Sequence, residues 1–126
     1  MIKGLGTDIV DVERVKQKIE KRFGFLEKVY SAQEIAICEP KGPSKYESYA
    51  GRFAAKEAFL KAVGISWIDE FNFNEIEVLN EASGKPYLKL SGSALEWAES
   101  GGITAILLSI SHTKAYATAT VILEHE

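Results

Sequence analysis

The chain has 126 residues, of which 46% are hydrophobic and 26% charged, and its formal net charge is −3. These proportions exclude disordered, collagen-like and mucin-like chains and predict one globular domain over residues 1–126. The net negative charge argues against general nucleic-acid binding. No apolar run approaches the roughly 18 to 20 residues of a membrane span, and the lone Cys38 forms no disulfide within the chain. We expect a cytoplasmic protein that binds neither nucleic acid nor membranes.

The first half of the chain predicts one strand followed by three helices. Residues 2–10 form an apolar strand in which Gly4 and Gly6 allow close approach of the backbone. Apolar residues recur every three or four positions over 11–23, which predicts an amphipathic helix, and 25–30 fit one further turn. Ser31 and Ser44 are each followed by glutamate three residues later. This capping-box signature predicts helices over 31–38 and 44–63, with a loop at 39–43 between them.

The second half predicts two strands, a helix and two more strands. Alternating apolar residues over 71–79 indicate a half-buried strand, and a turn at 80–86 leads to a strand over 87–90. A short helix over 93–99 precedes strands over 103–110 and 115–123. The whole order is typical of an α+β domain with a mainly antiparallel sheet packed against helices.

Three segments carry residues that suit chemistry. Asp8 lies near the end of the first predicted strand. In residues 53–62, helical spacing places Glu57 and Lys61 along one side of a helix, where a metal and phosphates can be held. Ser111 and His112 end a strand, where a hydroxyl and an imidazole can reach a ligand.

Each segment also has a purely structural interpretation. Asp8 is equally suited to capping the helix that follows. Glu57 and Lys61 form an i,i+4 pair in the favourable order. A lone histidine such as His112 is more often a turn residue than a ligand, and Gly84-Lys85-Pro86 is first of all a hairpin turn. Taken singly, none of these motifs supports a function.

Taken together, in this order and spacing, they resemble the holo-acyl-carrier-protein synthase type of phosphopantetheinyl transferase. The matching motifs are G-x-D-x-x-x-x-x-R at 6–14, F-x-x-K-E-A-x-x-K-A at 53–62, G-K-P at 84–86 and S-I-S-H at 109–112. The resemblance covers nearly the whole chain. It implies transfer of the phosphopantetheine arm of coenzyme A to a serine of apo acyl carrier protein, in support of fatty acid biosynthesis. Adenosine bisphosphate is the implied second product.

The resemblance also implies roles for individual residues. Asp8 and Glu57 match the family's magnesium ligands, and a hard cation with oxygen ligands suits phosphoryl transfer. Glu57 and Lys61 are the implied catalytic residues. The general base is either Glu57, acting through a metal-bound water, or a carboxylate of the carrier protein. The residues that we assign to coenzyme A are Arg52, Lys56, Lys61, Gly84, Lys85, Pro86, Ser111 and His112.

Basic residues outnumber acidic ones by six to three between Glu13 and Lys28. By charge alone, this segment is either a solvated helix face or a surface that attracts an acidic partner. The family pattern marks Arg14 for contact with the acidic carrier protein, and charge and helical phase add Lys18, Arg22 and Lys28. The resemblance further implies a homotrimer with active sites at the subunit boundaries.

Two other functions compete with this interpretation. One is a non-catalytic module that docks acidic proteins through the basic helix. The other is a different magnesium-dependent phosphotransferase or nucleotide hydrolase, for which the chain lacks the G-x-x-x-x-G-K-S/T loop.

Overall fold

The structure is a computed structural model that describes residues 1–64 and 71–126. Its helices and strands follow nearly the predicted order. The helical turn predicted at 25–30 forms a short helix over 25–29. In chain order they are β1 (Ile2–Asp11), α1 (Val12–Lys21), α2 (Phe25–Val29), α3 (Ala32–Cys38), the 3-10 helix η1 (Glu39–Ser44), α4 (Lys45–Val63), the 3-10 helix η2 (Phe73–Glu75), β2 (Ile76–Asn80), β3 (Pro86–Leu90), α5 (Gly92–Ser100), β4 (Ile103–His112) and β5 (Tyr116–His125).

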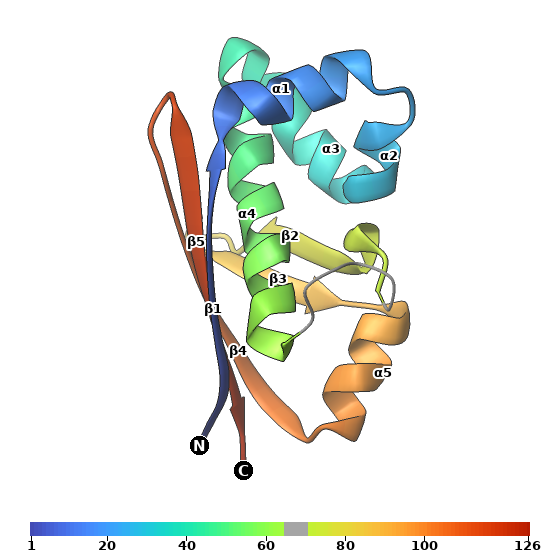
Figure 1. Cartoon of the computed structure of the whole chain (residues 1–126), viewed down its shortest axis with the longest axis vertical. Coiled ribbons are helices and arrows are strands. Elements are labelled where there is room, and N and C mark those ends of the chain that lie inside the picture. Colours follow the sequence, from blue (N-terminus) through green and yellow to red (C-terminus); the bar gives the residue numbers. More distant parts are fainter. Residues whose placement is uncertain (65–70) are drawn as a thin grey trace.

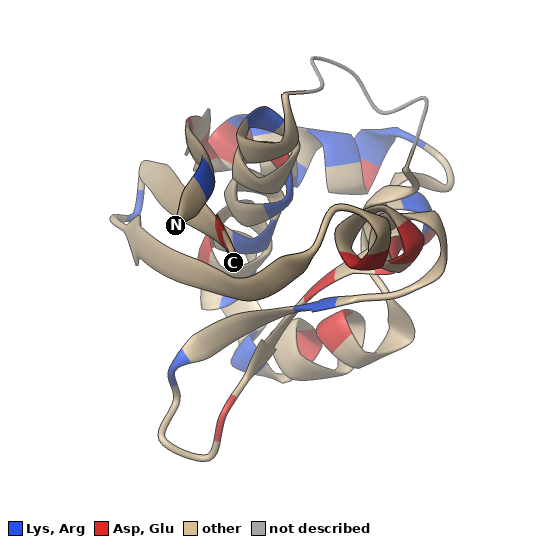
Figure 2. Cartoon of the chain, turned by 90° about the horizontal axis from the view of Figure 1, so that it is seen from below, with Lys and Arg blue, Asp and Glu red and all other residues tan. Residues whose placement is uncertain are grey.

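The strands form two antiparallel sheets, so the predicted α+β class is confirmed. One sheet has the order β1-β5-β4 and the other is the β2-β3 hairpin. The helices and the small sheet lie on one side of the three-stranded sheet (Figure 1). The β2-β3 hairpin projects from the body of the chain when it is seen from below (Figure 2). No helix in the described ranges is long and apolar enough to cross a membrane.

Helix α4 occupies the centre of the molecule and is buried on most of its sides. Its alanines Ala50, Ala54, Ala55 and Ala58 have no exposed surface. The close approach predicted for the first strand is confirmed, because a Cβ added to Gly6 would overlap the carbonyl oxygen of Ala58. Small residues on both elements therefore let β1 lie directly against α4.

The local predictions at helix starts are partly confirmed. Ser31 and Glu34 form the predicted capping box, with the hydroxyl 3.2 Å and the carboxylate 3.0 Å from the other residue's amide nitrogen. The capping box predicted at Ser44 is wrong. Ser44 has helical backbone angles because η1 runs directly into α4, and its hydroxyl donates to the Lys41 carbonyl instead.

The strand predicted over 71–79 begins only at Ile76. Residues before it form the turn η2, in which the Glu75 carboxylate accepts the Asn72 amide at 3.0 Å. The same carboxylate accepts the amide and the hydroxyl of Ser93 at the start of α5. Glu75 therefore fastens this turn to α5, which the apolar alternation does not reveal.

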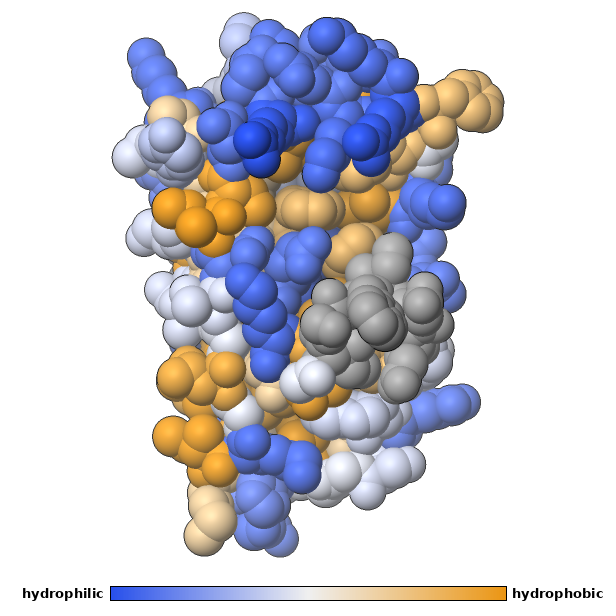
Figure 3. Space-filling view, viewed as in Figure 1, coloured by the Kyte–Doolittle hydropathy of each residue, from blue (hydrophilic) through white to orange (hydrophobic). Residues whose placement is uncertain are grey.

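The outer face of the three-stranded sheet carries apolar side chains. Leu5 and Ile9 on β1 are each 65% exposed. Leu5 and Leu107 both pair with Ile122, so these three residues form one row across the sheet. Apolar side chains gather along the left edge of the space-filling view, over the lower part of β1 (Figure 3). The next row on this face is Thr7, Thr120 and Ser109, so the outer face presents apolar and polar side chains together.

Candidate active site

Residues from β1 and α4 form the first group of candidate site residues. The Lys61 ammonium lies 2.8 Å from the Asp8 carboxylate. Glu57 lies one helical turn before Lys61 on α4. Burial and then the negative charge of Asp8 raise the pKa of Glu57 above its ordinary value, against the opposing charges of Lys61 and Lys18. The fold therefore brings together three residues that the motifs place 49 and 53 positions apart.

The position of Asp8 follows from the glycines that precede it. Alternate residues of a strand share one face, so Asp8 lies on the same face as Gly4 and Gly6. Those glycines bring that face against α4. Asp8, two residues after Gly6 along the strand, therefore also faces this helix. Capping of α1 falls to Asp11 instead, whose carboxylate accepts the Arg14 amide at 3.2 Å.

The donor set of this group fits a magnesium ion. Asp8 and Glu57 supply carboxylate oxygens from two different elements, and burial, together with the nearby charge of Asp8, raises the pKa of Glu57. Within residues 1–64 and 71–126, no group of three or more His, Cys, Asp or Glu side chains could enclose a metal. Magnesium usually binds one or two carboxylates and completes its octahedron with water and substrate oxygens.

A pocket of about 300 Å³ forms the second group, on the other side of α4. Of the residues assigned to coenzyme A, Arg52, Pro86 and His112 line it. The His112 ring nitrogen Nδ1 lies 3.1 Å from the Glu47 carboxylate, which fixes the imidazole against α4. Residues that the motifs did not indicate also line this pocket, among them Lys41, Ser48 and Asn80.

Arg52 is the main electrostatic feature of this pocket. It is only 6% exposed, and its guanidinium donates to the Ser48 hydroxyl at 2.8 Å and to the Asn80 side-chain oxygen at 2.7 Å. Its Nε has no hydrogen-bond partner. None of the carboxylates in the described part of the chain forms an ion pair with it. Because a buried cation without a counter-charge is costly, this arrangement suits an anionic ligand.

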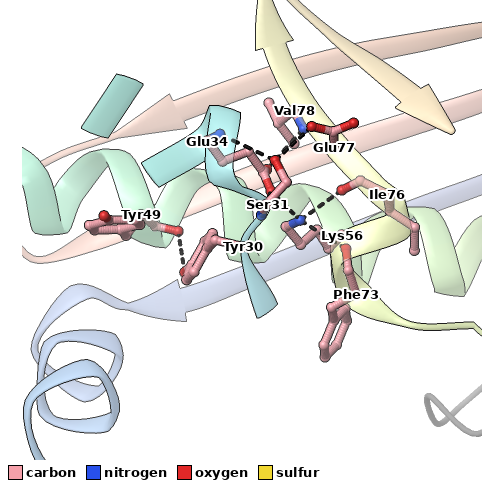
Figure 4. A network of polar contacts seen from close by, with 9 residues as sticks. All are labelled: Tyr30, Ser31, Glu34, Tyr49, Lys56, Phe73, Ile76, Glu77 and Val78. Atoms are coloured by element: carbon pink, nitrogen blue, oxygen red, sulfur yellow. Dashed lines mark hydrogen bonds and ion pairs between the residues drawn. The ribbon is translucent and has the colours of Figure 1, made fainter. Parts of the chain in front are cut away.

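Lys56 does not belong to either group, which corrects its assignment to coenzyme A. Its side chain is fully buried, and its ammonium donates to Glu34 at 2.7 Å and to the carbonyls of Phe73 and Ile76 at 2.9 and 2.8 Å (Figure 4). An ammonium has three N–H donors, and all three are used inside the protein. Lys56 therefore joins α3 and β2 to α4 and has no donor left for a phosphate.

Ser111 and His112 lie on opposite faces of β4. Ile110 and His112 line the pocket, so the pleat turns Ser111 to the outer face of the sheet, where it pairs with Thr118. Within one chain Ser111 therefore does not meet His112. Of the hairpin turn, Pro86 reaches the pocket, whereas Gly84 adopts a left-handed conformation with φ 93° and supplies the backbone bend before Lys85.

Of the basic residues predicted to contact a partner, Arg14 and Lys18 lie on α1 and Arg22 directly follows it, whereas Lys28 lies on α2. Arg14, Lys18, Lys21 and Arg22 line a shallow depression of about 230 Å³ with Gln17 and no acidic residue. Hydrophilic side chains cover this part of the molecule at the top of Figure 3. The Lys18 ammonium lies 5.4 Å from the centre of the Phe53 ring on α4, and its charge acts on Glu57. The basic surface of α1 is therefore continuous with the Asp8–Glu57 group.

The two groups lie at opposite edges of the three-stranded sheet. Asp8 on β1 and Ile110 on β4 both pair with Ala119 of β5, which separates those edges by about 10 Å. Arg52 and Glu57 are five residues apart on α4, so their side chains point about 140° apart around the helix axis. One chain thus presents its two groups in different directions.

Comparison with known proteins gives the class of this chain. The pattern of the 4′-phosphopantetheinyl transferase superfamily matches residues 4–121. A holo-[acyl-carrier-protein] synthase of Ruminiclostridium cellulolyticum is 49% identical over 91% of this chain and 87% of its own length, and one of Cytophaga hutchinsonii is 47% identical over 97% of both. The crystal structure of a holo-(acyl-carrier-protein) synthase from Bacillus anthracis in complex with CoA (3′,5′-ADP) has a TM-score of 0.83 and 38% identity, over 100% of this chain and 99% of that one.

The chain belongs to the 4′-phosphopantetheinyl transferase superfamily. Its resemblance to the holo-acyl-carrier-protein synthases is confirmed at high identity over nearly the full length, and it is an enzyme of that type.

Proposed function

We propose that this enzyme uses magnesium to transfer the 4′-phosphopantetheine arm of coenzyme A to a serine of apo acyl carrier protein, in support of fatty acid biosynthesis. The observation that carries the proposal is the convergence of Asp8 and Glu57 beside Lys61. Family membership and the coenzyme A complex of the Bacillus anthracis relative support the choice of substrate.

The reaction is a phosphoryl transfer with a defined balance of bonds. The serine oxygen of the carrier protein forms a bond to the phosphorus that bears the pantetheine arm, and the pyrophosphate bond breaks. Adenosine 3′,5′-bisphosphate leaves with the electron pair of the broken bond. The serine proton passes to a carboxylate, which is either Glu57, acting through a water molecule, or a carboxylate of the carrier protein.

Charge is the main requirement of this step, because the substrate is anionic and negative charge develops on the leaving group. Asp8 and Glu57 would hold the magnesium ion, which when bound would supply Lewis-acid stabilisation of the pyrophosphate. Lys61, whose side chain is 53% exposed beside Asp8, offsets charge on the leaving phosphate. Both positive charges act at the same end of the ligand.

The nucleotide end of coenzyme A is assigned to the pocket around Arg52. This cation lacks a carboxylate partner within the described residues, and Lys41 donates to the Ser48 hydroxyl at 3.2 Å beside it. Pro86 and His112 complete the wall. Phosphates of the nucleotide provide the anionic partner that Arg52 lacks within the described residues.

The proposed assembly is a homotrimer with each active site between two subunits. The Asp8–Glu57 group lies at the β1 edge of the sheet and the Arg52 pocket at the β4 edge. A head-to-tail ring brings the β4 edge of one subunit beside the β1 edge of the next. The exposed apolar residues Leu5, Ile9 and Leu107 offer surface for such contacts, and Ser111 on the same face then meets a neighbouring subunit.

Mass spectrometry of apo acyl carrier protein incubated with coenzyme A, magnesium and this enzyme tests the transfer. We expect the carrier protein to gain one phosphopantetheine group. Asp8→Ala and Glu57→Ala are each expected to abolish the gain while the far-ultraviolet circular dichroism spectrum is retained, and Glu96→Ala on α5 is the matched control. No mass gain, with a working transferase in parallel, rejects the proposal. A different result would indicate the docking module: carrier protein still binds the Glu57→Ala variant, binding persists in the presence of a metal chelator, and no transfer is seen under any condition.

Mixing two inactive variants tests the subunit boundary. Glu57→Ala and His112→Ala impair different groups, so a mixed ring contains some sites with two intact halves. We expect activity to return after co-refolding of the two variants. Activity that stays at the level of the separate variants places both groups in one subunit.

A further inference from the structure

The Arg52 guanidinium is held by two neutral partners. Ser48 lies one turn before Arg52 on α4 and accepts from Nη1 at 2.8 Å. Asn80, at the end of β2, accepts from Nη2 at 2.7 Å through its side-chain oxygen. Buried arginines are normally paired with carboxylates. Here the guanidinium is oriented by hydrogen bonds while its full positive charge remains available to a ligand.

Asn80 makes a second contact that connects Arg52 to the hairpin turn. Its side-chain nitrogen donates to the Gly84 carbonyl at 3.0 Å. The turn is closed further by backbone hydrogen bonds from Glu81 to Lys85 and from Gly84 to Glu81. Asn80 also pairs with Pro86, the residue of the turn that reaches the pocket. One amide side chain therefore fixes the cation and the pocket wall relative to each other.

We propose that Asn80 is a positioning residue that determines the affinity of the pocket for the phosphates of coenzyme A. Its amide oxygen orients Arg52 without neutralising it, and its amide nitrogen holds the Gly84-Lys85-Pro86 turn beside that cation. This inference rests on the proposed nucleotide site of the enzyme. It adds a residue outside the four sequence motifs.

Asparagine and aspartate have nearly the same shape, but an ionised aspartate adds a negative charge and, like alanine, lacks the amide donor to Gly84. Asn80→Asp keeps an oxygen acceptor for Arg52 but places a carboxylate beside the guanidinium, so a phosphate competes with an internal anion. Asn80→Ala removes both hydrogen bonds and leaves the charge of Arg52 unopposed. If neutrality of the partner matters, Asn80→Asp must be the more harmful substitution, although it is closer to the natural residue in size.

Titration calorimetry with adenosine 3′,5′-bisphosphate measures this directly on the full chain, without turnover. We expect Asn80→Asp to weaken binding at least tenfold and Asn80→Ala to weaken it by a smaller factor. Steady-state assays are expected to show a higher KM for coenzyme A with kcat nearly unchanged, because Asn80 acts on the nucleotide end of the ligand and not on the phosphorus that reacts. Asn74→Ala, an exposed asparagine in η2, is the matched control, and thermal unfolding checks that each variant is folded.

The possible outcomes separate this inference from the proposed function. If the wild-type chain binds adenosine 3′,5′-bisphosphate and both Asn80 variants bind it with the same affinity, the role of Asn80 is overturned. The nucleotide site is then retained. Asn80→Ala as harmful as Asn80→Asp, or more so, limits Asn80 to holding the turn and overturns the electrostatic part. Failure of the wild-type chain to bind adenosine 3′,5′-bisphosphate rejects the nucleotide site itself.

Discussion

Lys61 pairs with Asp8 on the neighbouring strand at 2.8 Å, although Glu57 on its own helix has the spacing of an i,i+4 partner. The ammonium is thus drawn across from α4 to β1, and its charge acts on both carboxylates. This arrangement makes the charge of Lys61 act on any metal bound between those carboxylates.

Substitution of Lys61 is therefore expected to change metal binding and catalysis in opposite directions. Lys61→Met removes a positive charge near the proposed metal ligands, and we expect magnesium to bind about tenfold more tightly. Transfer to the carrier protein should nevertheless fall, because the leaving phosphate loses a counter-charge. Magnesium titration and turnover of the same preparation measure the two effects. Weaker magnesium binding in Lys61→Met contradicts this account.

The raised pKa of Glu57 predicts how stability depends on pH in the absence of metal. Between the ordinary pKa, about 4.3, and the higher folded-state pKa, the folded chain retains a proton that the unfolded chain has lost. The stability contributed by this carboxyl is complete below the ordinary value and is lost as pH rises through the folded-state value. Glu57→Gln avoids this loss, so its melting temperature should exceed that of the wild type at pH 7. Melting curves that differ equally at pH 4 and pH 7 exclude Glu57 as the cause.

Arg14 tests the basic surface on α1. Arg14→Glu is expected to raise the KM for carrier protein on the order of tenfold at low salt, with little change in the KM for coenzyme A. The defect should shrink at high salt, because screening weakens interactions between exposed charges. Lys3→Glu makes the same charge change outside this surface and serves as control. An unchanged carrier-protein dependence in Arg14→Glu removes α1 from the interface.

The buried pair of Lys56 and Glu34 predicts a large effect on stability. Lys56→Ala leaves a buried carboxylate without its cation, which typically costs about 3–5 kcal/mol. Lys45→Ala breaks the more exposed pair with Glu39 and should cost only about 0–1 kcal/mol. Urea denaturation of both variants measures the two values. Equal costs contradict the structural role assigned to Lys56.

The class of the fold and the kind of chemistry that the motifs suit could both be predicted from the order of the amino acids. Hydrophobic periodicity predicts helices and strands because it reports which side of each element is buried, and Gly4 and Gly6 already indicate close packing. The acidic and basic side chains within the segment 53–62 indicate metal and phosphate chemistry. Such patterns are local, because each depends only on residues a few positions apart in the sequence.

The tertiary structure decided which of those residues act together. Lys56 and Lys61 belong to the same motif, yet packing of α3 and β2 against α4 buries Lys56 completely, whereas Lys61 lies at the β1 edge beside Asp8. The pleat of β4 separates Ser111 from His112 in the same way. Asn80 meets Arg52 only because β2 packs against α4, whereas Ser48 lies one turn away on the same helix. Burial and long-range contact depend on how the elements pack, and a linear pattern does not contain that information.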